Sequence, residues 1–152
     1  MLTDDELISK FLLLGKESGY LTPTGARVRI RYAKRSNGRR EAESLLLELK
    51  KKGEVRILVK FLNHFLQLAI EGRISSPEDF KQLEESQGIW EFREHKGNYR
   101  LYCYFDQDRR EISLTHGCRK PKGHAAERAE INKAALIRDE DQAKDQSDEH
   151  ER

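Results

Sequence analysis

The residues best suited to bind a charged ligand alternate with apolar residues between positions 88 and 117. Arg93, Arg100, Tyr102 and Tyr104 fall on alternate positions of their segments, and apolar side chains fill the positions between them. A guanidinium group binds phosphate oxygens in a fixed fork, and a tyrosine ring can stack on a base. The pattern therefore favours a polyanion whose bases can stack, although the exposed face of a highly charged sheet would look the same without a ligand.

The same alternation predicts three strands in a sheet with one buried face. Successive side chains of a strand point to opposite faces, so a period of two separates an apolar face from a polar one. Turns at residues 96–98 (Lys-Gly-Asn) and 106–108 (Asp-Gln-Asp) separate the strands, because these residue types tolerate the backbone angles of hairpins. Residues 88–117 are therefore expected to form an antiparallel meander.

A further strand is predicted at residues 27–32, where arginine alternates with valine, isoleucine and tyrosine. Its basic face is formed by Arg27, Arg29 and Arg31 and could continue the Arg/Tyr face of the meander. Charged side chains also commonly protect the edge of a sheet, so both interpretations stay open.

Helical spacing of apolar residues predicts the elements that must position these strands. A capping-box spacing begins a first helix of about three turns, which is expected to end before Gly15. Residues 39–52 and 54–70 are interpreted as a helical hairpin that covers the buried face of the sheet. A short helix from Ser76 and a helix at 125–138 complete the prediction. The expected fold is α+β: an antiparallel sheet packed against an N-terminal helical hairpin, with a C-terminal helix.

Charge is distributed unevenly along the chain. Residues 139–152 hold seven acids and two bases, so residues 1–138 carry a net charge of +7 although the total is only +2. No apolar side chain larger than alanine follows Arg138, and such a segment buries too little surface to become ordered by itself, which predicts an acidic tail that is disordered or a frayed extension of the preceding helix. An N-terminal helical extension at 1–25 and one folded domain at 26–138 are expected before it. The basic domain points to an acidic partner.

The cysteine content and the hydropathy of the chain favour a reduced, cytoplasmic protein. Cys103 and Cys118 are the only cysteines, and their spacing is not that of a metal site, so neither a metal nor another cofactor is expected. No apolar run reaches the ~20 residues that span a bilayer, and the acids near the N-terminus do not resemble a secretory signal. No membrane contact is therefore expected.

The order of these motifs resembles the RelE/ParE superfamily of bacterial toxins, and within it the HigB-type and phage-derived members. That superfamily places an aromatic and a basic residue on the strand after a glycine, here Trp90 and Arg93. A Gly-x-Tyr-Arg turn at residues 97–100 leads into the next strand, and a glycine ends the last strand before a basic loop at 119–120. The resemblance covers residues 26–138.

This resemblance implies a toxin of a type II toxin-antitoxin system that cuts messenger RNA in the ribosomal A site. In such a reaction the 2′-hydroxyl of the RNA attacks the neighbouring phosphorus, and the protein supplies charge stabilisation and proton transfer. Relatives of the ParE type instead poison DNA gyrase, and a catalytically inactive binding relative would share the fold, so both alternatives stay open. The implied partners are mRNA, the ribosome and a cognate antitoxin with a helix-turn-helix domain.

The resemblance also nominates the residues of a catalytic site. Arg93, Arg100 and Arg119 would stabilise charge on the phosphoryl oxygens. His116 would transfer a proton, unless it is a core-rim histidine, as its place in the alternation indicates. No single residue is identified as the general base, and glutamates interrupt the basic face. The residues expected to bind RNA are Tyr102, Tyr104, His95, Lys96, Lys120, Lys122, Arg27, Arg29 and Arg31.

Overall fold

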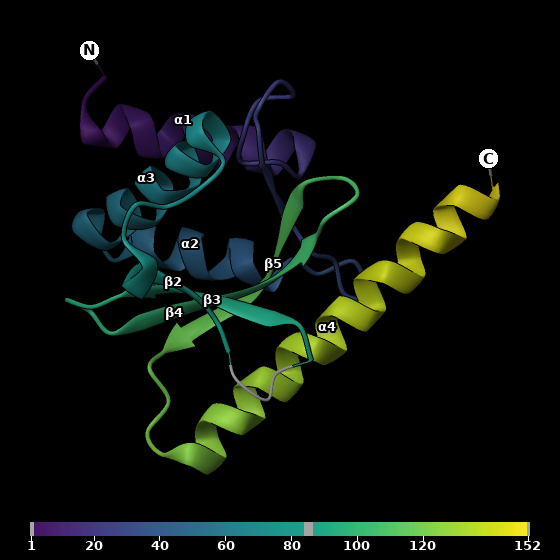
Figure 1. The fold of residues 1–152 in the computed structure, drawn as a ribbon. Coiled ribbons are helices and arrows are strands. Elements are labelled where there is room, and N and C mark those ends of the chain that lie inside the picture. Colours follow the sequence, from purple (N-terminus) through teal and green to yellow (C-terminus); the bar gives the residue numbers. More distant parts are fainter. Residues whose placement is uncertain (1, 84–86, 152) are drawn as a thin grey trace.

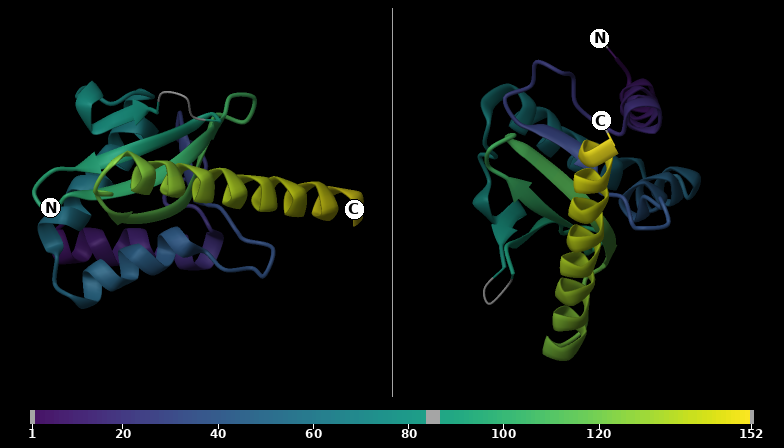
Figure 2. Two further views of the ribbon diagram at one scale, coloured as in Figure 1. Left: turned by 90° about the horizontal axis from the view of Figure 1, so that it is seen from below. Right: turned by 90° about the vertical axis from the view of Figure 1, so that its right-hand side faces the viewer.

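Helices cover both faces of a central sheet (Figure 1). The computed structural model describes the backbone of residues 2–83 and 87–151 and the side chains of residues 2–83 and 87–144. Three helices lie on one face of the sheet, and a fourth, long helix crosses the other face, as the two further views in Figure 2 also show. The three are α1 (Asp4–Ser18), α2 (Glu41–Lys51) and α3 (Val55–Glu71), and the fourth is α4 (His124–Glu151).

Within the described residues, five strands form one sheet in the order β1-β5-β4-β3-β2. The predicted antiparallel meander is confirmed as β3 (Ile89–Glu94), β4 (Tyr99–Asp106) and β5 (Glu111–Arg119). β1 (Arg29–Tyr32) pairs with β5 in parallel, because the chain crosses over through α2 and α3 before β5 is reached. The α+β class is confirmed, and the mixed sheet corrects the expectation of antiparallel pairing throughout.

The larger hydrophobic core lies between the sheet and the helices α1 to α3. Phe61 and Phe65 of α3 are fully buried there, and Phe65 meets the ring of Phe92 edge to face, with ring centroids 5.2 Å apart. The predicted helical hairpin is thus confirmed as α2 and α3. The N-terminal segment packs into this same core through Ile8, Phe11, Leu12 and Leu21.

Helix α1 continues past its predicted end to Ser18. Gly15 lies inside the helix, where an added Cβ would come within 2.8 Å of both Leu21 and the Tyr32 ring. Its missing side chain therefore serves close packing, and the helix ends instead at Gly19, which adopts a left-handed conformation (φ 81°).

The prediction of a short helix from Ser76 is wrong. A single 3-10 turn (Pro77–Asp79) leads into β2 (Phe80–Gln82), which pairs with β3. The local signals of a helix start are present, but the Phe80 ring stacks on Trp90 and Phe92, with centroid distances of 4.9 and 4.4 Å. Packing across the sheet therefore outweighs the local pattern. The part of this prediction that falls on residues 84–86 lies outside the described residues.

Helix α4 begins near its predicted start but continues to Glu151 instead of ending at Arg138. The side chains of Glu140 and Asp141, which open the acidic segment, bond to residues in and after β1. Of the two alternatives for the tail, residues 139–144 follow the extension of the helix, and pairing with fixed basic groups orders a segment that has no large apolar side chain.

Candidate active site

A small pocket lies on the α4 side of the sheet, where β3, β4, the loop after β5 and α4 meet. Its volume is about 100 Å³. Four residues that the sequence nominates, Arg93, Arg100, Tyr102 and Lys120, come together in its wall. This basic pocket is lined by Glu91, Arg93, Arg100, Tyr102, Lys120, Pro121 and Glu127.

Two arginines face each other on neighbouring strands at the basic pocket. Arg93 of β3 and Arg100 of β4 are directly paired in the sheet register, an arrangement that like charges disfavour. The carboxylate of Glu91 offsets this repulsion, since its Oε1 lies 2.6 Å from Arg93 Nε and 3.9 Å from Arg100 Nε. Glu91 is 2% exposed and Arg100 is 5% exposed. One carboxylate beside two guanidinium groups leaves a net positive charge, which suits a phosphate.

A β-bulge brings His116 to the same side of the sheet as the basic pocket. Tyr102 pairs with His116, but the next residue, Cys103, pairs with Leu114, so Thr115 is an extra residue in β5. This extra residue reverses the alternation after Leu114. His116 therefore points toward α4 instead of joining Leu114 in the larger core, which the strict alternation in the sequence could not show.

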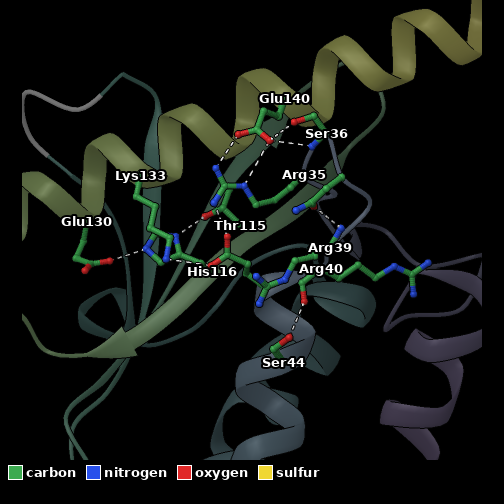
Figure 3. A network of polar contacts seen from close by, with 12 residues as sticks. Arg35, Ser36, Arg39, Arg40, Ser44, Thr115, His116, Glu130, Lys133 and Glu140 are labelled. Atoms are coloured by element: carbon green, nitrogen blue, oxygen red, sulfur yellow. Dashed lines mark hydrogen bonds and ion pairs between the residues drawn. The ribbon is translucent and has the colours of Figure 1, made fainter.

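His116 lies behind the basic pocket, beneath α4. It is 2% exposed, its Nε2 lies 2.7 Å from Glu130 Oε2 of α4, and its ring stacks on Tyr102 with a centroid distance of 4.9 Å (Figure 3). Burial lowers the pKa of the imidazole, and the contact with Glu130 only partly opposes this effect. The imidazole is therefore neutral at pH 7, and it links the pocket wall to α4.

Tyr102 forms a buried wall of the basic pocket. Its side chain is fully buried, and the Cys118 thiol lies beside its hydroxyl without reaching hydrogen-bond geometry. Burial raises the pKa of the Tyr102 hydroxyl above its ordinary value and raises the pKa of the Cys118 thiol to about 11. Both groups therefore stay protonated at neutral pH.

Several nominated residues lie away from the basic pocket. The Arg119 guanidinium lies over the Tyr99 ring, 5.1 Å from its centroid, and Tyr99 belongs to the core on the opposite face of the sheet. The imidazole of His95 contacts Asp79, with His95 Nε2 3.0 Å from Asp79 Oδ1. Lys96 and Lys122 are exposed in turns outside the lining of the pocket. The structure therefore joins Arg93 and Arg100 but separates Arg119 from them.

Tyr104 and Arg31 are held by the acidic end of α4. Tyr104 is 5% exposed, and its hydroxyl donates a short hydrogen bond to Asp141. Arg31 donates two hydrogen bonds to the same carboxylate, at 2.7 and 3.0 Å. The expected exposure of Tyr102 and Tyr104 is therefore wrong, because α4 covers the face that carries them. Their binding of RNA stays a prediction.

The other two arginines of the predicted strand, Arg29 in β1 and Arg27 before it, differ in their surroundings. The Arg29 guanidinium lies 3.6 Å from the centroid of the Tyr20 ring, and its Nη1 lies 3.7 Å from Glu111 Oε2. Arg27 is exposed. Of the arginines that were predicted to form a basic face, Arg31 thus lies on the α4 side of the sheet. Arg29 is engaged by Tyr20 and Glu111.

Further ion pairs fix α4 above the sheet (Figure 3). Arg35, in the segment after β1, lies 2.8 Å from Glu140 of α4 and 2.6 Å from Glu41 of α2. Lys133 of α4 lies 3.0 Å from the other oxygen of Glu41. The side chain of Ser36 also donates a hydrogen bond to Glu140, at 2.6 Å. These contacts join α4 to the segment after β1 and to α2. They therefore hold in place the part of α4 that lines the basic pocket.

Two carboxylates of the pocket were not nominated from the sequence. Glu91 interrupts the basic face in the sequence, yet its parity with Arg93 places it on the same side of β3, and this parity could have identified it. Glu127 comes from α4, and nothing in the sequence shows which side of that helix meets the sheet. Its carboxylate makes no hydrogen bond or ion pair within the part of the chain that the structure describes.

Two kinds of feature are absent from the residues that the structure describes. No group of three or more histidine, cysteine, aspartate or glutamate side chains among them could hold a metal ion. Of the helices described, none is both long and apolar enough to cross a membrane.

The fold is a helical hairpin on one face of a mixed sheet and a helix on the other face, with a basic pocket beneath that helix. A family match assigns the chain to the toxin-like RelE/ParE superfamily. The chain belongs to the family of phage-derived Gp49-like proteins (DUF891), whose family model matches residues 45–138. This family is one branch of the superfamily, and the match does not single out HigB-type members. Comparison with curated proteins and with solved structures found no match.

Proposed function

We propose that the protein is the toxin of a type II toxin-antitoxin system and that it cleaves messenger RNA at the ribosome. The pairing of Arg93 with Arg100 in the basic pocket carries this proposal, because two facing guanidinium groups with one buried carboxylate between them form a site for a phosphate. Membership in a toxin-like family supports the same conclusion.

In the proposed reaction the 2′-oxygen of one ribose bonds to the adjoining phosphorus, and the bond from phosphorus to the 5′-oxygen of the next nucleotide breaks. The 2′-hydroxyl gives a proton to a base, and the leaving 5′-oxygen takes up a proton. The products are a 2′,3′-cyclic phosphate and a 5′-hydroxyl. Arg93 and Arg100 would stabilise the charge on the phosphoryl oxygens, and Lys120 would donate to the leaving oxygen.

We assign the role of the base to Glu127. The carboxylate of Glu91 is nearly fully buried and is engaged by Arg93. His116 is equally buried, and its Nε2 is engaged by Glu130. Glu127 is half-buried, lines the same pocket as the arginines and has an unoccupied carboxylate within the described residues. In this assignment His116 positions Tyr102 and α4 and does not touch the RNA.

A toxin of this family implies an antitoxin as its partner. We propose that this antitoxin carries a helix-turn-helix DNA-binding domain and an acidic inhibitory segment. The net charge of +7 on residues 1–138 would attract such a segment, and the association should slow as salt screens the field.

The proposal is tested by inducing the chain in cells without an antitoxin and mapping transcript ends. Arrested growth with new cuts inside translated codons is the expected result for the wild type. The Arg100→Ala variant should lose the cuts, whereas Arg119→Ala removes a guanidinium from the opposite face and should keep them. Intact transcripts with gyrase-linked DNA breaks would assign the protein to the ParE type instead. Normal growth with intact transcripts would indicate an inactive relative.

A further inference from the structure

A second, larger cavity adjoins the basic pocket. Its volume is about 440 Å³, within the range of about 300–1,000 Å³ that is usual for small-molecule sites. It lies between the edge of the sheet at β2 and the first turns of α4, and it shares Arg93 and Glu127 with the basic pocket. The two cavities therefore form one continuous surface with Arg93 and Glu127 at their junction.

The lining of the second cavity has the chemistry of a site for a nucleobase. Leu83 and Ile131 give it an apolar surface. Both also pack in a second, smaller hydrophobic core, which lies beneath α4. Side-chain amides line it at Gln82, Gln87 and Asn132. A base presents two flat apolar faces and an edge of donors and acceptors, which such a combination can bind, and the guanidinium plane of an arginine can stack on it.

The charges around the second cavity favour an RNA strand over an acidic peptide. Lys81 and His124 also line the cavity, where they could bind a backbone phosphate. Glu127 at the junction needs a hydrogen-bond donor, which the ionised side chains of an acidic peptide do not offer. The same carboxylate can accept a hydrogen bond from a ribose hydroxyl, which an RNA strand presents beside each phosphate.

We propose that this cavity binds the nucleotide immediately 5′ of the bond that is cut. The inference rests on the proposed function. In an RNA strand the attacking 2′-hydroxyl belongs to the nucleotide on the 5′ side of the reacting phosphate. With that phosphate on Arg93 and Arg100, a base in the second cavity places its own 2′-hydroxyl at the junction, next to Glu127. The strand thus runs 5′ to 3′ from the second cavity into the basic pocket.

Binding of nucleoside monophosphates tests this polarity without any cleavage. A nucleoside 3′-monophosphate can place its base in the second cavity, its phosphate on the arginines and the adjoining 2′-hydroxyl beside Glu127. A 5′-monophosphate that places its base and phosphate in the same way holds its 2′-hydroxyl away from Glu127 and so loses that contact. Titration calorimetry on the purified full chain should show that the best-bound 3′-monophosphate binds about ten- to a hundredfold more tightly than its 5′ isomer, the effect expected for one charge-assisted contact. Equal affinities of the isomers would overturn the inference.

A matched pair of variants on α4 tests the place of binding. Asn132→Trp fills the second cavity, and Ala129→Trp adds the same bulk at an exposed position of the same helix that does not line it. Asn132→Trp should abolish the preference for the 3′ isomer, and Ala129→Trp should keep it. Both variants should unfold at the same temperature as the wild type. An unchanged preference in a folded Asn132→Trp protein would place the nucleotide elsewhere.

The outcomes separate this inference from the proposed function. If the wild type cuts transcripts but binds the two isomers equally, the polarity is wrong and the RNase stands. If neither isomer binds and no transcript is cut, while an acidic peptide binds and Asn132→Trp abolishes that binding, the cavity is a peptide site and both proposals fail. Binding of the 3′ isomer without any cut would keep the subsite and overturn the RNase.

Discussion

Asp141→Asn should destabilise the protein strongly, although the residue lies in an acidic segment that looks dispensable in the sequence. Asp141 is 1% exposed and accepts hydrogen bonds from Arg31, the Lys34 amide and Tyr104. Removing one partner of a buried ion pair destabilises by about 3–5 kcal/mol. Because the Arg31 side chain keeps 13% exposure, we expect the lower end of this range, about 3 kcal/mol. For a chain of this size the midpoint of thermal unfolding should fall by about 6–12 °C.

Urea unfolding followed by circular dichroism measures this loss, with Asp139→Asn as the matched control. Asp139 is 63% exposed and, among the residues that the structure describes, pairs only with its neighbour Arg138, so its replacement should change the free energy of unfolding by less than about 0.5 kcal/mol. Equal effects of the two substitutions would refute the assignment of Asp141 as an anchor of α4.

The difference between the wild type and Asp141→Asn should also depend on pH. Burial alone would raise the pKa of Asp141, but the hydrogen bonds from Arg31 outweigh it and hold the pKa below its ordinary value of 3.8. The stabilisation is therefore complete above pH 3.8 and is lost as the pH falls through the lower pKa of the folded state. A difference that stays constant into strong acid would contradict this origin.

Three further predictions concern the site and its support. Arg100→Ala should slow RNA cleavage by about 10² to 10³ in single-turnover assays, whereas Arg119→Ala should leave the rate unchanged, and equal losses would contradict the placement of the two side chains on opposite faces. Glu127→Gln should slow cleavage by about 10² to 10⁴, because the proposed base is lost, and an unchanged rate would assign the base to another group. Gly117→Val should destabilise the fold by about 1–3 kcal/mol in urea, because an added Cβ would meet Leu45 and lie 2.9 Å from the Arg100 carbonyl oxygen, and unchanged stability would show that this packing adapts.

The meander and the helical hairpin could be predicted from the sequence because their patterns are local. Alternation and turn residues at 96–98 and 106–108 are sufficient to define β3, β4 and most of β5. The edge strand β2 was missed because the Pro-Glu-Asp sequence just before it is typical of a helix start, and only the stacking of Phe80 on distant rings indicates a strand. Local signals therefore fail where a partner in another element decides the structure.

The site could be predicted only in part for the same reason. Arg93 and Arg100 were identified because they occupy recurring positions on two strands, and the register brings them together. The bulge at Thr115 turns His116 toward α4, and the alternation of apolar and polar residues in the sequence does not reveal it. The contact between Arg31 and Asp141 joins residues 110 positions apart. Helix α4 buries Ile137 and the small Ala134 but exposes Leu136, so no clean apolar stripe reveals its contact face.

We propose above that the 2′-hydroxyl of the RNA attacks the phosphorus in the basic pocket. Purified protein and ribosomes programmed with a synthetic message test this directly. One message is all RNA, and a second carries a single 2′-deoxynucleotide immediately 5′ of the mapped cut. The wild type should cut only the first and leave a 2′,3′-cyclic phosphate and a 5′-hydroxyl, and Arg100→Ala should cut it about 10² times more slowly. Cleavage of the deoxy message at the same bond, or full activity of Arg100→Ala, would contradict the account.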